Sequence, residues 1–159
     1  MRKKLTIWLF EKSEKTYTKF KKKQPWNITR AQLLEYPDDT LGFALGTFLQ
    51  ANGFELIPKV ERHDAYHVLT GYGTEVQDEI ALQYLCFGNG KRSPYLFGVT
   101  ILGTLLLPDY WKYYIESYKL GKSCNPFHQF NYLHLLNYSL DELRTIIFNK
   151  EELATLLKK

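Results

Sequence analysis

Signals that start and stop helices recur along this chain, whereas the alternating apolar and polar runs typical of strands are nearly absent. Three capping boxes begin at Thr29, Thr74 and Ser139, and each pairs a hydroxyl with a Gln or Glu side chain three residues further on. Asn52-Gly53 is a favourable left-handed end for a helix over 40–51. The sequence therefore predicts an all-α fold, an orthogonal or up-down helical bundle.

Further helix boundaries follow from prolines and glycines, because proline opens helices and glycine often ends them. Pro58 is expected to open a helix that runs to Leu69, and the next helix begins at Thr74 and ends at Phe87-Gly88. The remaining helices are expected over 94–107, over 109–120 with Gly121 as their end, from Asn125-Pro126 onward, and over 143–157 with a break near Asn149.

The composition is that of a globular protein. A length of 159 residues favours one domain over 1–159, and 45% hydrophobic with 24% charged residues argues against a disordered chain. Aromatic residues make up 16% of the chain, which predicts a core walled by large flat side chains. Cys86 and Cys124 form no CxxC motif, so neither a disulfide framework nor a thiolate metal site is predicted, and a reducing cytoplasm fits.

Residues 1–23 combine clustered lysines and arginines with apolar and aromatic side chains such as Trp8 and Phe10. This basic amphipathic pattern is typical of a solvated helix face, and a helix on an anionic membrane surface is the functional alternative. The apolar run over 5–10 is too short for a signal peptide, so we expect a cytoplasmic protein, with peripheral contact at the inner face of the cytoplasmic membrane. A net charge of +4 without a recognition module predicts no nucleic-acid partner.

The segment 94–107 is apolar on every side, but it is shorter than the ~20 residues that span a bilayer. It is therefore predicted to be a buried helix. A glycine inside a helix costs about 1 kcal/mol relative to alanine, so a neighbouring helix or a ligand should approach the backbone at Gly98 and at Gly103. Phe97, Gly98, Ile101 and Leu105 are the predicted wall of an apolar site for a lipid tail.

His63, Asp64 and His67 are the strongest candidates for chemistry. A helix advances about 100° per residue, so His67 lies about 40° and Asp64 about 100° round from His63, which places all three on one face. Glu79 follows a glycine-punctuated turn and is expected to face the histidines. This set suits a borderline divalent cation, with zinc as first choice and magnesium or manganese second. Zinc-protease chemistry is disfavoured because no glutamate stands between the histidines.

The motif HDxxH over 63–67, followed by eleven residues and Glu79, resembles the signature of the ubiquinone (coenzyme Q) biosynthesis family named after the fourth Coq protein. The segment Tyr36–Gly42 resembles that family's Tyr-Pro-x-x-Thr-Leu-Gly pattern. Asp78–Ala81 resembles its Gly-Glu-Ile-Ala helix start, with an aspartate in place of the glycine. Together these segments lie within 36–144, most of the chain.

This resemblance implies an α-helical protein whose metal ligands, which also carry the catalysis, are His63, Asp64, His67 and Glu79. It implies binding of an isoprenoid lipid or quinone precursor, peripheral membrane contact, and work alongside other quinone-biosynthesis proteins. Two functions are therefore expected as alternatives: oxidative decarboxylation of a polyprenyl hydroxybenzoate by a lyase, or a non-catalytic lipid-binding scaffold for an enzyme complex. Arg62 and Tyr66 are expected near the substrate, and a homodimer is left open.

Overall fold

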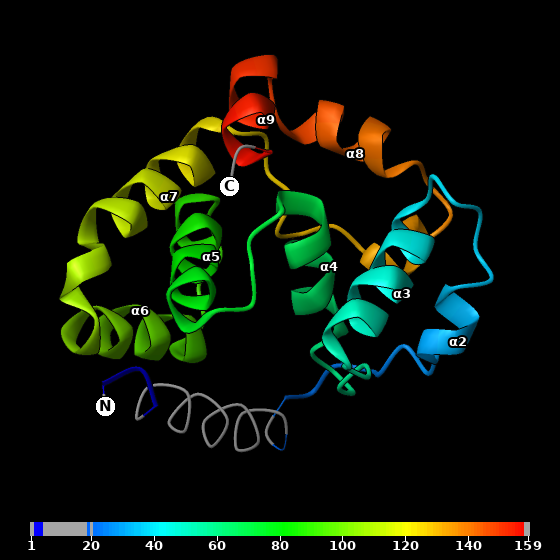
Figure 1. Ribbon diagram of the computed structural model, residues 1–159, viewed down its shortest axis with the longest axis horizontal. Coiled ribbons are helices and arrows are strands. Elements are labelled where there is room, and N and C mark those ends of the chain that lie inside the picture. The colour runs from blue at the N-terminus through cyan, green and yellow to red at the C-terminus, as the bar shows by residue number, and fades with distance from the viewer. Residues whose placement is uncertain (1, 5–18, 20, 158–159) are drawn as a thin grey trace. The chain divides into compact units, whose positions relative to one another are not determined.

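The computed structural model describes residues 2–4, 19 and 21–157, and these residues form helices and connecting segments without a strand (Figure 1). The all-α prediction is confirmed. Most of the predicted basic amphipathic segment at the N-terminus lies outside the described residues. Two compact units can be distinguished: unit 1 comprises Met1–Phe20 and Tyr72–Gln129, and unit 2 comprises Lys21–Gly71 and Phe130–Lys159.

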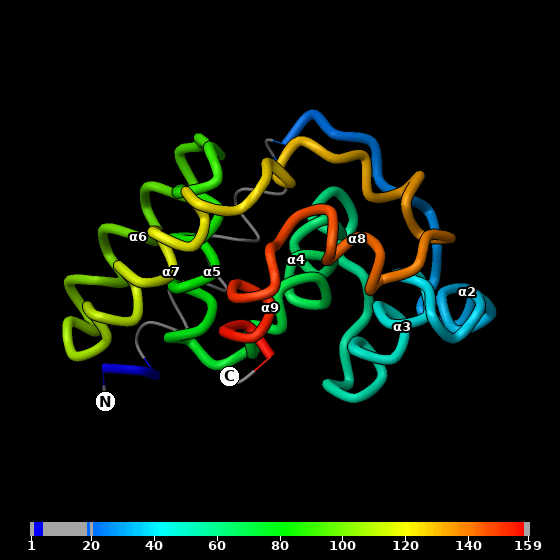
Figure 2. The backbone as a smooth tube through the Cα atoms, turned by 90° about the horizontal axis from the view of Figure 1, so that it is seen from above, coloured from blue at the N-terminus to red at the C-terminus, as the bar shows by residue number. Residues whose placement is uncertain are grey.

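Figure 2 follows the chain through the helices of both units. Unit 1 contains α5 (Val76–Gly88), α6 (Pro94–Leu106), the short 3-10 turn η1 (Pro108–Tyr110) and α7 (Trp111–Ser123). Unit 2 contains α2 (Arg30–Leu33), α3 (Leu41–Asn52), α4 (Glu61–Thr70), the 3-10 turn η2 (Tyr132–Leu135), α8 (Leu140–Ile147) and α9 (Lys150–Leu156).

In unit 1, α5 and α7 lie side by side and their backbones touch at two glycines (Figures 1 and 2). A Cβ atom on Gly88 would collide with the Tyr118 carbonyl oxygen, and one on Gly121 would collide with the Leu85 carbonyl oxygen. The prediction that Gly121 ends a helix is wrong, because α7 continues to Ser123. Glycine is needed inside this helix to let two backbones approach closely.

The prediction that the helix over 94–107 is buried is wrong for one of its sides. The buried side carries Leu96, Val99, Thr100 and Gly103. The exposed side carries Phe97, Ile101, Leu102 and Leu105, the last with 72% of its surface exposed. The predicted close approach to the backbone is confirmed at Gly103, where a Cβ would press on Ile80 of α5, and it is wrong at Gly98, where a Cβ would meet open space. Because this sequence is apolar all round, it could not show which side meets the core.

In unit 2, α4 begins at Glu61, later than the predicted start at Pro58. Lys59 has a left-handed backbone with φ of 75°, so the chain turns there and cannot continue from the proline into a helix. The end is close to the prediction, since Gly71 adopts φ of 71° directly after α4.

Two predicted helix starts in unit 1 are wrong. The capping box at Thr74 does not form, because α5 begins one residue later than that box requires and no side chain caps it. No helix starts at Asn125-Pro126. The side chain of Asn89 instead binds that segment, its Oδ1 accepting from the amides of Phe127 at 2.9 Å and His128 at 3.1 Å. These hydrogen bonds hold the backbone in an irregular path.

The other caps of unit 2 agree with the sequence. Thr29 forms its full capping box, and Gly53 ends α3 with φ of 67°. Only half of the capping box predicted at Ser139 forms at the start of α8: the Ser139 hydroxyl accepts from the Glu142 amide at 3.5 Å. The predicted break near Asn149 is confirmed, because that residue opens α9 with a capping box of its own.

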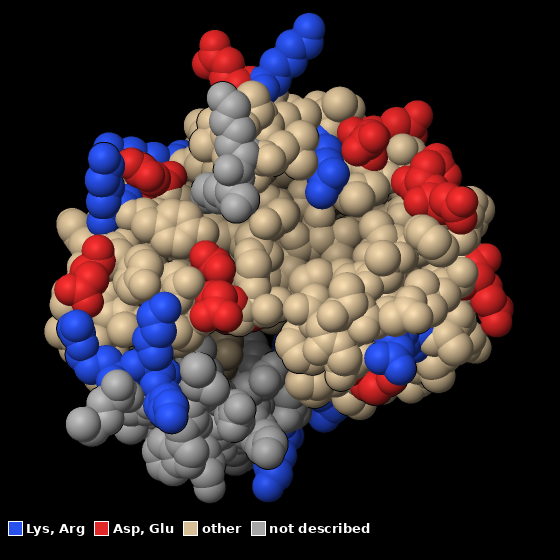
Figure 3. Space-filling model, in the orientation of Figure 1, with Lys and Arg blue, Asp and Glu red and all other residues tan. Residues whose placement is uncertain are grey.

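Charged side chains of both signs are scattered over the face shown in Figure 3. The described helices include none with the length and apolarity that crossing a bilayer requires.

Candidate metal centre

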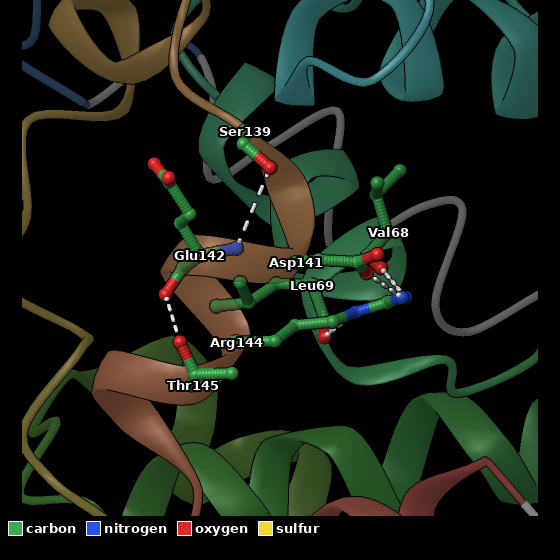
Figure 4. Close-up of polar contacts among 7 residues, drawn as sticks. All are labelled: Val68, Leu69, Ser139, Asp141, Glu142, Arg144 and Thr145. Atoms are coloured by element: carbon green, nitrogen blue, oxygen red, sulfur yellow. Dashed lines mark hydrogen bonds and ion pairs between the residues drawn. The ribbon is translucent and has the colours of Figure 1, made fainter.

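The helix that carries three of the predicted ligands, α4, is tied to α8 within unit 2 (Figure 4). The Arg144 guanidinium donates from Nη2 to the Val68 carbonyl at 2.9 Å and from Nε to the Leu69 carbonyl at 3.1 Å. It also pairs with Asp141 at 3.6 Å. The last turn of a helix leaves carbonyls without intrahelical donors, so Arg144 supplies donors where α4 has none of its own. This contact fixes the C-terminal end of α4.

His63 and His67 lie one turn apart on α4, and their rings meet. The two Nε2 atoms are 3.2 Å apart, and the ring planes are nearly perpendicular at 86°. His67 is buried and His63 is half-buried. Without a cation, this contact is a hydrogen bond in which one neutral imidazole donates and the other accepts.

The same separation fits two ligands of one metal ion. Zinc binds imidazole nitrogens at 2.0–2.1 Å in tetrahedral geometry, so two such nitrogens on one ion lie about 3.3 Å apart. The observed 3.2 Å between the Nε2 atoms is close to that separation. The pair therefore has the spacing of two coordinating nitrogens without any rearrangement of α4.

One face of the His67 ring is covered by Phe48 of α3, with ring centroids 5.5 Å apart and planes within 13° of parallel. Sequence reasoning missed both Phe48 and Arg144. Phe48 lies on the helix before α4 and Arg144 on a helix much later in the chain, and helix periodicity within α4 cannot show which residues of another helix it meets. An aromatic residue inside a predicted helix is ordinarily assigned to the core. The sequence carried no signal for either contact.

The other two predicted ligands lie on different helices. Asp64 follows His63 on α4, Glu79 lies near the start of α5 in unit 1, and both are partly buried. Within unit 2, the described side chains of His63 and His67 belong to a group that could bind a cation. Coordination by Asp64 and by Glu79 stays a prediction.

Asp78, directly before Glu79, accepts a hydrogen bond from the Tyr113 hydroxyl at 3.0 Å. Burial, and then the nearby Asp78 carboxylate, raise the pKa of the Tyr113 phenol far above its ordinary value. Burial likewise raises the pKa of the Tyr72 phenol, which donates to Ser117 Oγ at 2.7 Å. Both phenols therefore remain neutral donors at physiological pH.

The predicted substrate contacts on α4 differ in accessibility. The Arg62 guanidinium lies 5.9 Å from the centroid of the Tyr66 ring. Tyr66 is 1% exposed and packs edge-on against Tyr132 with ring centroids 5.5 Å apart. Arg62 is half-buried, whereas Tyr66 is a core residue.

The predicted lipid-contacting residues of α6 share one side of that helix. Phe97, Ile101 and Leu105 are exposed and lie one turn apart, and a Cβ at Gly98 would meet open space. They form an apolar stripe on the surface of unit 1. A helix side of this kind can receive an apolar chain, a membrane or a partner protein.

Comparison with known proteins places the histidine motif in a family. The family model described as coenzyme Q (ubiquinone) biosynthesis protein Coq4 matches residues 59–149, more than half of the chain. The chain belongs to the Coq4 family. The matched segment runs from the turn before α4 to the end of α8 and contains all four predicted ligands. Coq4 proteins, by that description, serve coenzyme Q (ubiquinone) biosynthesis.

A solved structure agrees with the fold of this Coq4-family chain. A protein from Nostoc punctiforme PCC 73102, described as a ubiquinone biosynthesis protein, superposes with a TM-score of 0.59 at 21% sequence identity. The alignment covers 91% of this chain and 80% of that chain. At this identity the similarity shows the helical architecture alone. No curated protein sequence matches the chain.

Proposed function

We propose that this Coq4-family protein holds a divalent cation with His63, Asp64, His67 and Glu79 and promotes the oxidative decarboxylation of a polyprenylated hydroxybenzoate. The observation that carries the proposal is the 3.2 Å separation of the two Nε2 atoms, which suits two ligands of one ion. A set of two imidazoles and two carboxylates favours zinc, with magnesium or manganese second.

The protein's own residues would bind and orient the precursor. His63 and His67 bring their Nε2 atoms within 3.2 Å of each other, and Arg62 brings a permanent positive charge that would attract the precursor's carboxylate. The apolar stripe of α6 offers contact area for the polyprenyl tail. When bound, a divalent cation would supply Lewis-acid stabilisation of the negative charge that develops as carbon dioxide leaves.

Metal content tests whether the protein holds a divalent cation. Elemental analysis of protein purified without added metal should find bound divalent metal in the wild type, and His63→Ala and His67→Ala should lose most of it. His134→Ala is the matched control, because His134 is an exposed histidine on η2. The site is refuted if the wild type binds no divalent cation after incubation with zinc, magnesium or manganese, or if both α4 variants retain it.

Turnover tests whether the protein promotes the decarboxylation. Metal-loaded wild type should convert a short-chain prenylated hydroxybenzoate, and Glu79→Gln should lose that conversion while circular dichroism shows an unchanged helix content. Glu75→Gln is the control, since Glu75 is an exposed carboxylate just before α5. Equal turnover by wild type and Glu79→Gln would remove Glu79 from the proposed chemistry.

The exposed stripe of α6 favours a second candidate, a non-catalytic scaffold that binds the precursor and presents it to other quinone-biosynthesis proteins. Peripheral contact with the inner face of the cytoplasmic membrane belongs to this candidate. It predicts that wild type and Glu79→Gln bind the precursor equally and that neither converts it. Ile101→Asp should then abolish binding, because it places a charge in the middle of the stripe.

A further inference from the structure

Phe48 has a contact that the proposed metal chemistry does not use. It lies in the last half of α3, half-buried, and its ring stacks on the His67 imidazole with centroids 5.5 Å apart. Phe54, just after α3, meets the Phe48 ring edge-on with centroids 6.5 Å apart and planes at 70°. The imidazole of one predicted ligand therefore rests on a flat aromatic support that α3 supplies.

This stack determines the plane of the His67 ring. Phe48 lies within 13° of parallel to it, so a large rotation of the imidazole about its Cβ–Cγ bond would break the face contact. In that plane, His67 Nε2 lies 3.2 Å from His63 Nε2. The orientation that keeps the stack is thus the orientation in which the two nitrogens converge.

We infer that Phe48 is a positioning residue, which holds the His67 imidazole in its metal-binding orientation before any cation arrives. The part of this inference that concerns metal affinity rests on the proposed function. A cation withdraws electron density from a bound imidazole, and the electron-rich face of a phenyl ring attracts such an electron-poor ring. The stack should therefore be retained, and strengthened, in the loaded protein.

Nuclear magnetic resonance of the metal-free protein tests the geometry by itself. The His67 imidazole proton signals should be shifted upfield by the ring current of Phe48, and nuclear Overhauser effects should connect the two rings. Phe48→Leu should abolish the upfield shift, whereas Phe48→Tyr, which keeps a six-membered ring, should preserve it. Absence of both the shift and the Overhauser effects in folded wild type would overturn the inference, whatever the variants do.

Zinc affinity, measured by competition with a chromogenic chelator, tests the consequence. Loss of a residue that orients a metal-bound histidine typically weakens metal affinity about 10- to 100-fold, so Phe48→Leu should bind zinc at least about 10-fold more weakly. Phe48→Tyr should bind within about twofold of wild type. Phe54→Leu is the matched control, because it removes a neighbouring ring that touches Phe48, and it should also stay near wild type.

The possible results separate the two claims. If Phe54→Leu weakens zinc binding as much as Phe48→Leu, or if Phe48→Leu binds like wild type, Phe48 does not position the ligand. If the wild type binds no zinc but shows the Overhauser contacts and ring-current shift, the proposed metal function fails while the stacking geometry stands. Cobalt-substituted protein gives a spectroscopic check, because a reoriented His67 in Phe48→Leu should change the intensity of the visible absorption bands.

Discussion

The crossing of α5 and α7 in unit 1 and the anchoring of α4 in unit 2 hold helices in place by opposite means. At the crossing, Gly88 and Gly121 have no side chain, and this allows the two helix backbones to touch. α4 is instead held by side chains from other helices. Arg144 binds the carbonyls at the C-terminal end of α4, and Phe48 stacks on the imidazole of His67.

This difference determines how each region responds to mutation. A backbone contact cannot adjust, since neither carbonyl can move without displacing its helix, so any added atom strains the whole crossing. A long side chain such as Arg144 can adapt, and its loss removes hydrogen bonds without creating a clash. We therefore expect unit 1 to show abrupt effects at glycines and unit 2 to show graded effects at side chains.

The largest effect is expected for Gly121→Ala, because the new Cβ would overlap the Leu85 carbonyl oxygen. The expected loss of unfolding free energy is about 3 kcal/mol or more, at the upper end of overpacking costs. Gly98→Ala is the control, since a Cβ there meets open space, and it should stabilise the protein by about 0.5–1 kcal/mol through helix propensity. Urea unfolding measures both. Similar stability changes in the two variants would contradict the proposed role of the backbone contact.

Arg144→Ala tests the anchoring of α4. The substitution removes two charge-assisted hydrogen bonds to the Val68 and Leu69 carbonyls. Because the Arg144 side chain is only 18% exposed, we expect the free energy of unfolding to fall by about 2 kcal/mol. Hydrogen exchange should accelerate in the last turn of α4 and stay unchanged at the α5 amides of unit 1. Asp141→Asn should have little effect, because that carboxylate is 90% exposed. Equal acceleration in both units would show that the anchor is not local.

The same contrast explains which features were predictable from the sequence. Caps at Thr29 and Gly53 are local, so their residue types sufficed. Gly121 was misread because a glycine that ends a helix and one that permits a crossing look alike without the partner helix. His63 and His67 were placed together by helix periodicity alone, whereas Phe48 depends on how α3 packs against α4.

Alkaline pH should weaken unit 1 through its buried phenols. Burial raises the pKa of Tyr72 well above its ordinary value of 10.0, so the folded phenol keeps its proton when the unfolded one loses it. The contribution of the protonated Tyr72 phenol to the free energy of unfolding is therefore complete below pH 10. It is lost as the pH rises above 10, because the unfolded state then binds fewer protons than the folded state.

Tyr72→Phe should make this alkaline loss less steep, at a cost near neutral pH of about 1 kcal/mol for the hydrogen bond to Ser117. Urea unfolding between pH 8 and pH 11, roughly the range around the ordinary tyrosine pKa, measures the slope. Tyr138→Phe is the control, because Tyr138 is 56% exposed. If both variants show the wild-type slope, burial of Tyr72 does not govern the alkaline behaviour.

The most local effect is expected at the cap of α9, which lies where the sequence predicts a helix break. Asn149 accepts from the Glu152 amide at 2.9 Å, and the Glu152 side chain accepts from the Asn149 amide at 2.8 Å. Asn149→Ala removes the first of these hydrogen bonds, so the free energy of unfolding should fall by about 1 kcal/mol. Asn149→Asp keeps an acceptor at the N-terminus and should stay near wild type. Because this cap involves neither a helix crossing nor a distant side chain, a cost as large as that of Arg144→Ala would mean that α9 also supports the rest of unit 2.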